Sequence, residues 1–356
     1  MLREKALLYL EKRGNIYFQH KCRGGFMGQT VSFIIQKGGC GKTTATANTA
    51  SYLALQGYRV LAIDMDPQGN LTQHFGYDTD NLAYSLVHLF TEKNSFEEVV
   101  LKRDEHLHIL PNNIEMTSVE FSLYKSFSRE YILRDVLAPV SNEYDFILID
   151  CPPNLGILSV NALVASTEFI LVVSPEFFPM RAIKPLYETY LMVKSKLNRT
   201  LKFKGVVMSM CDFRTRHAQE VRKILEKNFP HKLYKSYIRN SVSLKEASSH
   251  GKSIFEYDAA STGAFDYQNF VEEFLRDHAG ARQKKAFYEA HFHQLPAHEQ
   301  EEIIQFAMQN LSNYNRSRLD YLEEEPILRE ALLIERNKIL EKLFPYREHS
   351  TANQRP

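Results

Sequence analysis

The chain has 356 residues, of which 44% are hydrophobic and 24% are charged, as in ordinary soluble globular proteins. Its 44 basic and 43 acidic residues give a formal net charge of +1, which excludes a uniformly basic nucleic-acid coat but not a local basic patch. The four cysteines are scattered and form no Cys-x-x-Cys pair, so a disulfide framework and a zinc or iron–sulfur spacing are both excluded. Because no apolar run is long enough to cross a bilayer and no secretory signal is evident, we expect a cytoplasmic protein.

The first 28 residues form a short lead in which basic residues outnumber acidic ones. Gly24 and Gly25 interrupt its apolar pattern, so the lead is expected to be a surface helix or a disordered tail. Met27 is an alternative start of the protein, in which case the lead would be upstream reading frame.

From Thr30 onward, apolar strand patterns alternate with helical ones. A parallel sheet covered on both faces by helices is expected, because these strands are apolar throughout and do not alternate with polar residues. Ligands bind beyond the carboxyl ends of the strands in such sheets, and the polar motifs of this chain follow strands. The expected strands are 31–35, 59–63, 144–149, 169–173 and 203–208, and the first of them is followed by a helix over 45–56.

The strongest motif lies between the first strand and the first helix and reads Gly38-Gly39-Cys40-Gly41-Lys42-Thr43-Thr44. A glycine-rich turn directs successive backbone N–H groups at phosphate oxygens, and the helix N-terminus adds its positive dipole. Lys42 is expected to reach the β- and γ-phosphates and Thr43 to coordinate Mg²⁺. Gln36 stands where the plain P-loop pattern has its first glycine, and Lys37 adds a second lysine, so the motif is of the deviant form.

Acidic residues follow two further strands. Asp64 and Asp66 begin the segment 64–70, where one carboxylate can hold Mg²⁺ and the other can orient an attacking water. Asp150 ends the apolar run that starts at Phe146, which is the Walker B arrangement. Each motif alone is also compatible with a plain turn or a chance strand end, and their combination with the P-loop makes the nucleotide site the stronger interpretation.

The deviant P-loop at 37–44, the segment 64–70 and the stretch 145–156 resemble the ParA/MinD family of P-loop ATPases, and within it the ParA/Soj partition group. The likeness runs from about Gln29 to His278 and covers neither the lead nor the C-terminal residues. It implies a three-layer P-loop NTPase fold with a mainly parallel twisted sheet. Further similar segments are 176–183, 214–221, 238–247 and 249–253.

The resemblance implies an ATPase that is slow without a stimulating partner and that sandwiches ATP and Mg²⁺ between two subunits. Lys37 matches the lysine that crosses to the phosphates of the partner, and Asp66 matches the carboxylate that positions the hydrolytic water. Asp64 and Asp150 match carboxylates of the magnesium shell, together with Thr43. The ATP-binding set is Lys37, Gly38, Gly39, Cys40, Gly41, Lys42, Thr43 and Thr44, in which Cys40 occupies a variable position.

The resemblance also implies a nucleoid-associated homodimer that binds duplex DNA without sequence preference and is reset by a ParB-like adaptor. Such binding needs lysine and arginine side chains at backbone phosphates. Each candidate could equally be a solvated surface charge, and Arg239-Asn240 departs from the Ile-Pro-Arg-Asn form of chromosomal relatives. The DNA-binding candidates are Arg214, Arg216, Arg239, Lys245 and Lys252.

Residues 279–356 contain no strand-like run and show helical apolar spacing, so a helical C-terminal extension after the ATPase domain 29–278 is expected. Its amphipathic stretch 332–344 carries acidic residues among the basic ones, which favours helix packing over membrane binding. His106 and His108 lack the carboxylate or cysteine spacing of a metal site.

Three alternatives to DNA partition come from the same superfamily, and the sequence argues against two of them. A ParA/MinD-type positioning ATPase would use the same switch to place a protein complex instead of DNA. An electron-transfer or metal-cluster relative would need a cysteine pair, and a tyrosine-kinase relative would need a tyrosine cluster at residues 350–356, which have no tyrosine. The cargo and the stimulating partner are not encoded in any motif that we recognise.

Overall fold

The computed structural model describes residues 28–175 and 179–278. The predictions of a basic lead, of a start at Met27 and of a helical extension over 279–356 lie outside these residues, as do the first three residues of the segment 176–183. The chain divides into two compact units, residues 1–273 and 274–356, and the described part of the second is the last turn of one helix.

An eight-stranded sheet with the order β3-β4-β2-β5-β1-β6-β7-β8 forms the centre of the first unit. All neighbouring strands pair in parallel except β3 and β4, which pair in the antiparallel sense at one edge. The five strands expected from the sequence are all present. The strands are β1 (Gln29–Ile34), β2 (Val60–Asp64), β3 (Leu101–Lys102), β4 (Leu107–Leu110), β5 (Phe146–Asp150), β6 (Glu168–Val173), β7 (Lys202–Cys211) and β8 (Leu233–Arg239).

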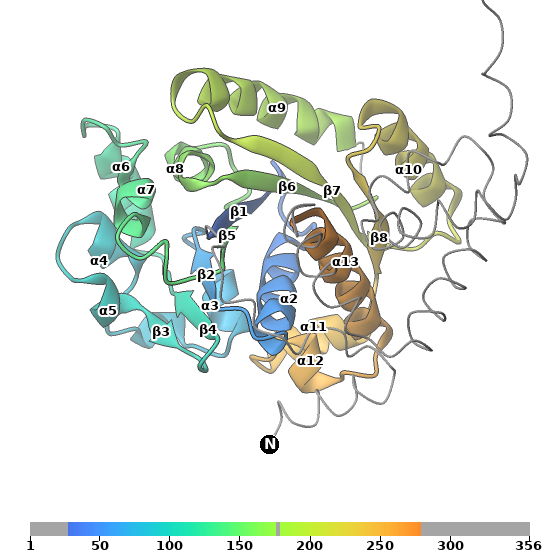
Figure 1. Cartoon of the computed structure of the whole chain (residues 1–356), viewed down its shortest axis with the longest axis horizontal. Helices are drawn as coiled ribbons and strands as arrows, with labels where there is room; N and C mark the ends of the chain where they lie inside the picture. The colour runs from blue at the N-terminus through green and yellow to red at the C-terminus, as the bar shows by residue number, and fades with distance from the viewer. Residues whose placement is uncertain (1–27, 176–178, 279–356) are drawn as a thin grey trace, which may run out of the picture. The chain divides into compact units, whose positions relative to one another are not determined.

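Helices cover both faces of the sheet: α8 and α9 lie on one face, and α2 lies on the other with the first part of α13 (Figure 1). The expected three-layer P-loop NTPase architecture with a mainly parallel sheet is therefore confirmed. Among residues 28–175 and 179–278, no helix combines the length and the apolar character that crossing a membrane requires. The helices are α2 (Lys42–Leu55), α3 (Asn70–His74), a 3₁₀ turn (Thr79–Asn81), α4 (Leu86–Phe90), α5 (Phe96–Val99), α6 (Met116–Leu123), α7 (Ile132–Leu137), α8 (Ile157–Ala165), α9 (Pro179–Lys196), α10 (Arg216–Asn228), α11 (Val242–Ser249), α12 (Ile254–Tyr257) and α13 (Thr262–His278).

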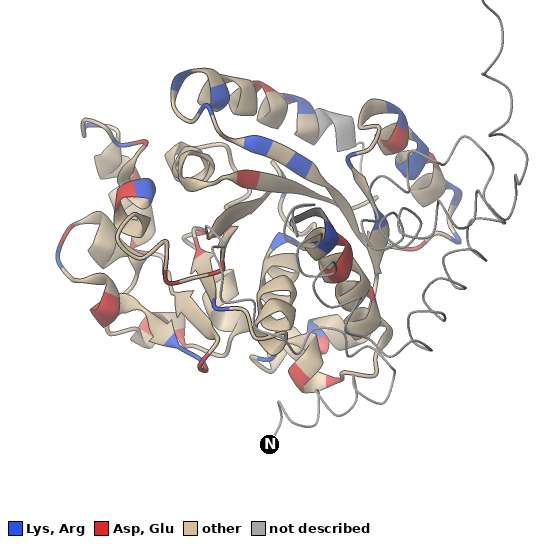
Figure 2. Ribbon diagram, in the orientation of Figure 1, with Lys and Arg blue, Asp and Glu red and all other residues tan. Residues whose placement is uncertain are grey.

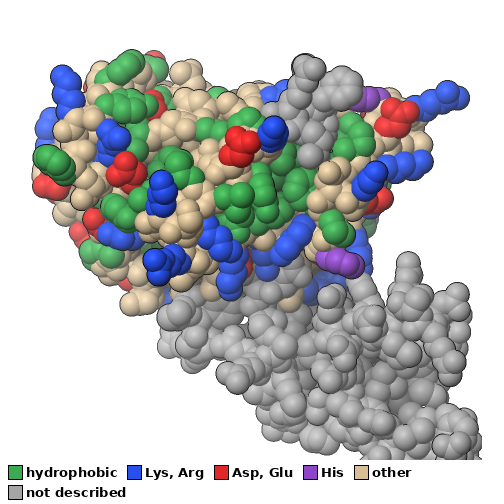
Figure 3. All heavy atoms as spheres, turned by 90° about the horizontal axis from the view of Figure 1, so that it is seen from above, with side chains coloured by type: hydrophobic (Ala, Val, Ile, Leu, Met, Phe, Trp, Pro, Cys, Tyr) green, Lys and Arg blue, Asp and Glu red, His purple; other side chains and the backbone are tan. Residues whose placement is uncertain are grey.

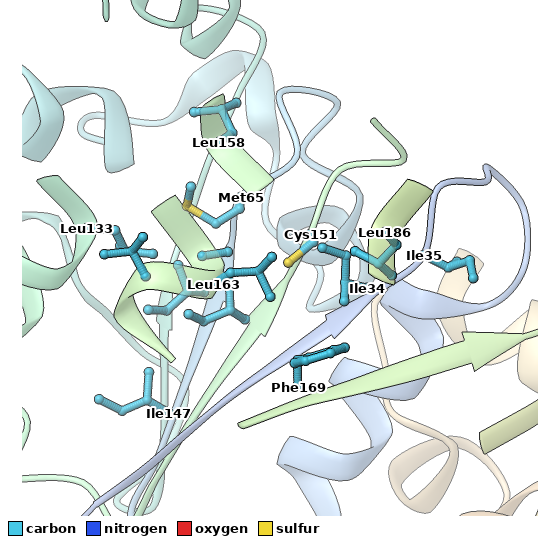
Figure 4. Packing of buried hydrophobic residues seen from close by; sticks show 14 of the residues in the cluster. Ile34, Ile35, Met65, Leu133, Ile147, Cys151, Leu158, Leu163, Phe169 and Leu186 are labelled. Carbon is cyan, nitrogen blue, oxygen red and sulfur yellow. The ribbon is translucent and has the colours of Figure 1, made fainter. Parts of the chain in front are cut away.

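A large hydrophobic cluster of the core lies on the α8 side of the sheet and includes Leu158 and Leu163 of the helix and Ile147 of β5 (Figure 4). Phe169 of β6 is also buried and stacks on Phe203 at a centroid distance of 5.2 Å. Burying apolar area contributes roughly 25 cal/mol per Å², so these contacts hold the central strands and their carboxyl ends in fixed register. The site described below depends on that register.

Helix α9 carries apolar side chains on both of its sides. Leu186 and Val193 are buried, whereas Tyr187, Leu191 and Met192 are 45–49% exposed. The surface on this side of the molecule shows hydrophobic side chains among lysine and arginine side chains (Figure 3). The outer face of α9 is therefore less polar than that of a typical solvated helix.

Candidate nucleotide-binding site

The glycine-rich loop connects the central strand β1 to α2 and adopts a conformation that requires glycine at two positions. Gly39 and Gly41 have φ angles of 69° and 84°, in the left-handed region. Gly41 is also the N-cap residue of α2 and, as a glycine, offers no side chain to accept a hydrogen bond from the first turn of this helix. The N–H groups and the dipole of α2 therefore face an anion site formed by the loop.

The two lysines of the loop differ in their environment. Lys42 is buried, and its Nζ donates a hydrogen bond of 2.7 Å to the backbone oxygen of Lys37. Lys37 is half-buried at the start of the loop, and its N–H donates to the oxygen of Ile35 at 2.8 Å. Lys42 is thus fixed inside the loop, whereas Lys37 keeps the partial exposure that a contact with a second subunit would need.

Two of the predicted acids are register partners at the carboxyl ends of adjacent parallel strands. Asp64 ends β2 and pairs with Asp150, which ends β5, and both side chains are buried. Thr43 Oγ1 donates a hydrogen bond of 2.6 Å to Asp150 Oδ2, which joins the first turn of α2 to β5. Among the described residues, Asp150 Oδ1 is buried without a hydrogen-bond partner, so one oxygen of this acid remains available to a ligand.

Asp64 organises the segment that follows β2. Its Oδ2 accepts hydrogen bonds from the backbone N–H and the hydroxyl of Thr72 at 2.9 and 2.8 Å, and its Oδ1 accepts from the N–H of Asp66 at 3.2 Å. Asp66 Oδ1 in turn accepts from the N–H of Gln68 at 3.0 Å. These bonds hold Asp66, which is 8% exposed, at the start of the segment that leads to α3.

Thr72 and Asn112 support this segment and are not part of any motif recognised in the sequence. The hydroxyl of Thr72 accepts a hydrogen bond of 3.0 Å from the N–H of Asn112, and Asn112 Nδ2 donates to the oxygen of Asp66 at 3.4 Å. Both residues are fully buried. A polar residue two positions after the β4 run and a threonine after the 64–70 segment are weak signals by themselves, because only the fold brings them together.

The three acids share a buried environment that disfavours their charge. Burial raises the pKa of Asp150 to about 7, and the hydrogen bond from Thr43 and the charge of Lys42 act in the opposite direction. Burial and the neighbouring Asp150 raise the pKa of Asp64 well above its ordinary value, and burial raises that of Asp66. Such a cluster favours a bound cation, which would relieve the repulsion between the carboxylates.

The residues present fit Mg²⁺. This ion prefers oxygen ligands and is held in phosphate sites by one or two protein groups in addition to phosphate oxygens and water. Thr43 and Asp150 supply two adjacent oxygen donors, and the unpartnered Asp150 Oδ1 is a third oxygen at the same place. The thiols of Cys40 and Cys151 are unsuitable as softer metal ligands, because both are buried and burial raises the pKa of each.

A pocket of about 440 Å³ opens at the carboxyl ends of β7 and β8, the same edge of the sheet. Ser209 of β7 donates a hydrogen bond to the backbone oxygen of Cys40, so this strand contacts the glycine-rich loop directly. The aromatic rings of Phe213 and Tyr237 meet edge to face with centroids 4.6 Å apart. The lining residues are Cys211, Asp212, Phe213, Arg214, Tyr237, Arg239 and Asn240.

The five DNA-binding candidates fall on two segments of the chain. Arg214 lies two residues before α10 and Arg216 is the first residue of that helix, on which lysine and arginine residues are frequent (Figure 2). Arg239 ends β8, Lys245 lies on α11 and Lys252 lies in the turn before α12. Within the described part of the chain, Arg214 pairs with Asp212 at 2.7 Å and Arg239 with the buried Asp266 at 2.6 Å.

His106 and His108, which we did not expect to bind a metal, lie at or before strand β4. His108 Nδ1 lies 2.8 Å from the hydroxyl of Tyr144, and His106 precedes β4. No cluster of three or more metal-ligating His, Cys, Asp or Glu side chains occurs in residues 28–175 and 179–278.

The central P-loop between β1 and α2, with acids at the ends of the two adjoining strands, defines a P-loop NTPase. The family described as AAA domain matches residues 28–203. The chain is similar to the chromosome-partitioning ATPase Soj of Treponema pallidum, with 38% identity over 70% of this chain and 98% of that protein. It is also similar to the sporulation initiation inhibitor protein Soj of Bacillus subtilis, with 37% identity over 69% of this chain and 98% of that protein.

Among solved structures, cobyrinic acid a,c-diamide synthase of Mycobacterium smegmatis with bound ADP and magnesium superimposes with a TM-score of 0.64. The two are 30% identical over 72% of this chain and 98% of that one. The chain belongs to the ParA/MinD family of P-loop ATPases, and its relatives are of the Soj/ParA type. It is therefore a ParA-like ATPase, and ATP and Mg²⁺ are its nucleotide and metal.

Proposed function

We propose that this protein is a partition ATPase that forms an ATP-bound sandwich dimer and binds duplex DNA without sequence preference. The observation that carries the proposal is the pair of lysines in one glycine-rich loop, Lys42 buried and Lys37 half-buried, above the Thr43–Asp150 pair. The similarity to a chromosome-partitioning ATPase at 38% identity supports the same function.

Each part of the nucleotide has a matching place in the site. The phosphates lie in the glycine-rich loop, at the N-terminus of α2, where the N-cap residue Gly41 has no side chain. The base enters the 440 Å³ pocket, where Phe213 and Tyr237 offer aromatic surface for stacking. The hydrogen bond between Ser209 and Cys40 joins the glycine-rich loop to β7, the strand whose end lines the base pocket.

The chain supplies the remaining parts of phosphoryl transfer. Thr43 and Asp150 would hold Mg²⁺, which would supply positive charge to neutralise the phosphates. Asp66 positions the attacking water with its carboxylate, the pKa of which is raised by burial. Lys37 of each subunit adds positive charge at the phosphates of the other subunit, where negative charge develops in the transition state.

Three of the five basic candidates are better suited to DNA than the other two. Arg214 and Arg239 have carboxylate partners within the chain, and both line the base pocket. Arg216, Lys245 and Lys252 form no ion pair with other described residues. Arg216 and Lys245 are exposed and Lys252 is half-buried, so all three side chains can reach a phosphate backbone.

In the cell, the ATP-bound dimer would associate with the nucleoid, and an adaptor protein of the ParB kind would stimulate hydrolysis and release it. This cycle moves a DNA cargo over the nucleoid. A positioning ATPase that places a protein complex would share the ATP site and the switch, and the two functions differ in what is carried.

The test is a titration of the full-length protein with random-sequence duplex DNA in the presence of ATP, ADP or no nucleotide, together with light scattering. We expect a dimer and DNA binding with ATP and Mg²⁺ only, and an affinity that falls steeply with salt. DNA binding that is absent or independent of nucleotide would contradict the proposal. A dimer that forms with ATP and ignores DNA would favour the positioning ATPase.

A further inference from the structure

The turn between α11 and α12 carries Lys252 and contacts two other segments of the chain, at Arg103 and at Gly76. It is defined here as residues 249–253. The N–H of Gly251 donates to the oxygen of Ser248 at 3.1 Å, and the N–H of Lys252 donates to the oxygen of Ala247 at 3.0 Å, so the turn is joined to the end of α11. Attachment to segments outside α11 and α12 needs further contacts.

Arg103 makes that attachment through one guanidinium group. Nη1 donates a hydrogen bond to the backbone oxygen of Phe75, and Nη2 donates to that of Gly251 at 3.3 Å. Nη2 also forms an ion pair with Glu256 of α12, with distances of 2.9 and 3.1 Å to the two carboxylate oxygens. Because the side chain of Arg103 is only 20% exposed, this pair is weakly screened by solvent.

The turn also packs directly on the backbone that follows α3. A Cβ atom at Gly251 would lie 2.5 Å from the Cα of Gly76, so only glycine allows this approach. Both residues have positive φ angles, 83° for Gly76 and 64° for Gly251. Arg103 therefore lies beside this backbone contact and donates hydrogen bonds to both of its sides, at Phe75 and at Gly251.

Both ends of this arrangement lead back to the nucleotide site. Helix α3 is held by Asp64 through Thr72, and Phe75 and Gly76 follow this helix directly. Asn48 of α2 accepts a hydrogen bond of 2.8 Å from the N–H of Ile254 and donates one of 2.8 Å to the oxygen of Thr44. The turn and the adjoining start of α12 are thus attached both to the segment that Asp64 organises and to the helix that follows the glycine-rich loop.

We propose that Arg103 is a positioning residue that holds the turn 249–253 against the segment after α3, and so sets the place of Lys252 relative to the nucleotide site. Its consequence for DNA rests on the proposed function above. Arg103 does not contact DNA itself, because its guanidinium is already engaged by Phe75, Gly251 and Glu256. Lysine cannot replace it, because an ammonium group lacks the planar set of N–H donors with which a guanidinium binds these three acceptors at the same time.

The first experiment measures the effect on the turn without any DNA. In the full-length protein, Arg103→Met should accelerate hydrogen exchange of the amides at 251–253 by about tenfold or more, because the turn opens more often. The strand amides of β5 should keep their wild-type rates. Lys102→Ala is the matched control, since it removes an exposed cation from the adjacent position. Unchanged exchange at 251–253 in Arg103→Met overturns the proposal.

The second experiment measures the consequence for DNA. Arg103→Met should raise the Kd for duplex DNA with ATP by about tenfold and make the salt slope shallower by about 0.9 for each DNA phosphate that the variant no longer neutralises. Lys252→Ala should do the same, and the double variant should add nothing, because both changes remove the same interaction with DNA. Additive effects of the two substitutions would contradict positioning. Arg103→Lys should resemble Arg103→Met and not the wild type.

The two proposals fail in different ways. If the wild-type protein does not bind DNA, the proposed function is contradicted. The hydrogen-exchange rates still decide whether Arg103 holds the turn. Glu256→Gln is a second variant that keeps a side chain of the same size and removes the charge of the ion pair, while its amide oxygen can still accept the hydrogen bond of 2.8 Å from the N–H of Ser253. It should accelerate exchange in the same amides to a smaller extent, and its failure to do so would argue against Arg103 acting through Glu256.

Discussion

His74 is predicted to make the fold sensitive to mild acid. It is the last residue of α3 and is 1% exposed, and neither ring nitrogen has a hydrogen-bond partner among the described residues. Burial lowers the pKa of His74 to about 4; the nearby positive charge of Arg103 acts in the same direction and Glu256 opposes it. Replacing His74 by leucine, a side chain of similar volume, removes this titration.

The size of the effect follows from proton linkage. The pKa of the unfolded histidine is 6.5, so between that value and about 4 the unfolded state binds a proton that the folded state does not. Stability is therefore fully present above pH 6.5 and is lost as the pH falls toward 4. The loss attributable to His74 is about 1.4 kcal/mol at about pH 5.5 and approaches about 3 kcal/mol below about pH 4.

The measurement is urea unfolding of the wild type and of His74→Leu at about pH 8 and about pH 5.5. Other groups contribute equally to both proteins, so the difference between their pH dependences isolates His74. The variant should lose about 1.4 kcal/mol less than the wild type between the two conditions. Replacing the exposed His217 by alanine controls for the loss of a histidine elsewhere. Equal pH dependence of His74→Leu and the wild type would refute the reasoning.

Three further substitutions address the nucleotide site. Lys37→Ala should abolish ATP-dependent dimerisation and leave the fold intact, which light scattering with ATP and Mg²⁺ can show; a dimer like that of the wild type would remove the proposed contact across subunits. Asp66→Ala should trap the ATP dimer and slow phosphate release by about 100-fold or more, and normal release would exclude Asp66 from positioning the water. Thr43→Val keeps the shape of the side chain and removes one Mg²⁺ ligand, so the Mg²⁺ concentration for half-maximal ATPase activity should rise about tenfold. An unchanged Mg²⁺ dependence would show that the hydroxyl is not a ligand.

The nucleotide site is readable from the sequence because its geometry is local. Gly39 and Gly41 permit the left-handed conformations of the loop, and α2 begins directly after it. Asp64 and Asp150 could be placed together because the carboxyl ends of parallel strands share one edge of a sheet. In each case a short segment carries the whole signal, and the fold class follows from the apolar strands alone.

The sequence could not show what each acid does within the site. Asp64 uses both oxygens on backbone and side-chain donors of the segment leading to α3, whereas Asp150 keeps one oxygen without a partner among the described residues. Both acids end apolar strands and look alike in the sequence. The difference arises from Thr72, which reaches Asp64 only because the chain turns back after β2.

The edge strand β8 and the partners of the basic residues were also decided by tertiary structure. β8 is half exposed and therefore lacks the apolar run by which the central strands were predicted. Arg239 meets Asp266, and Arg103 meets Glu256, across 27 and 153 residues of chain. Local sequence determines backbone conformation and strand ends, because neighbouring residues determine their own torsions. Which charges neutralise each other depends on packing between distant segments, and only the folded chain brings those segments together.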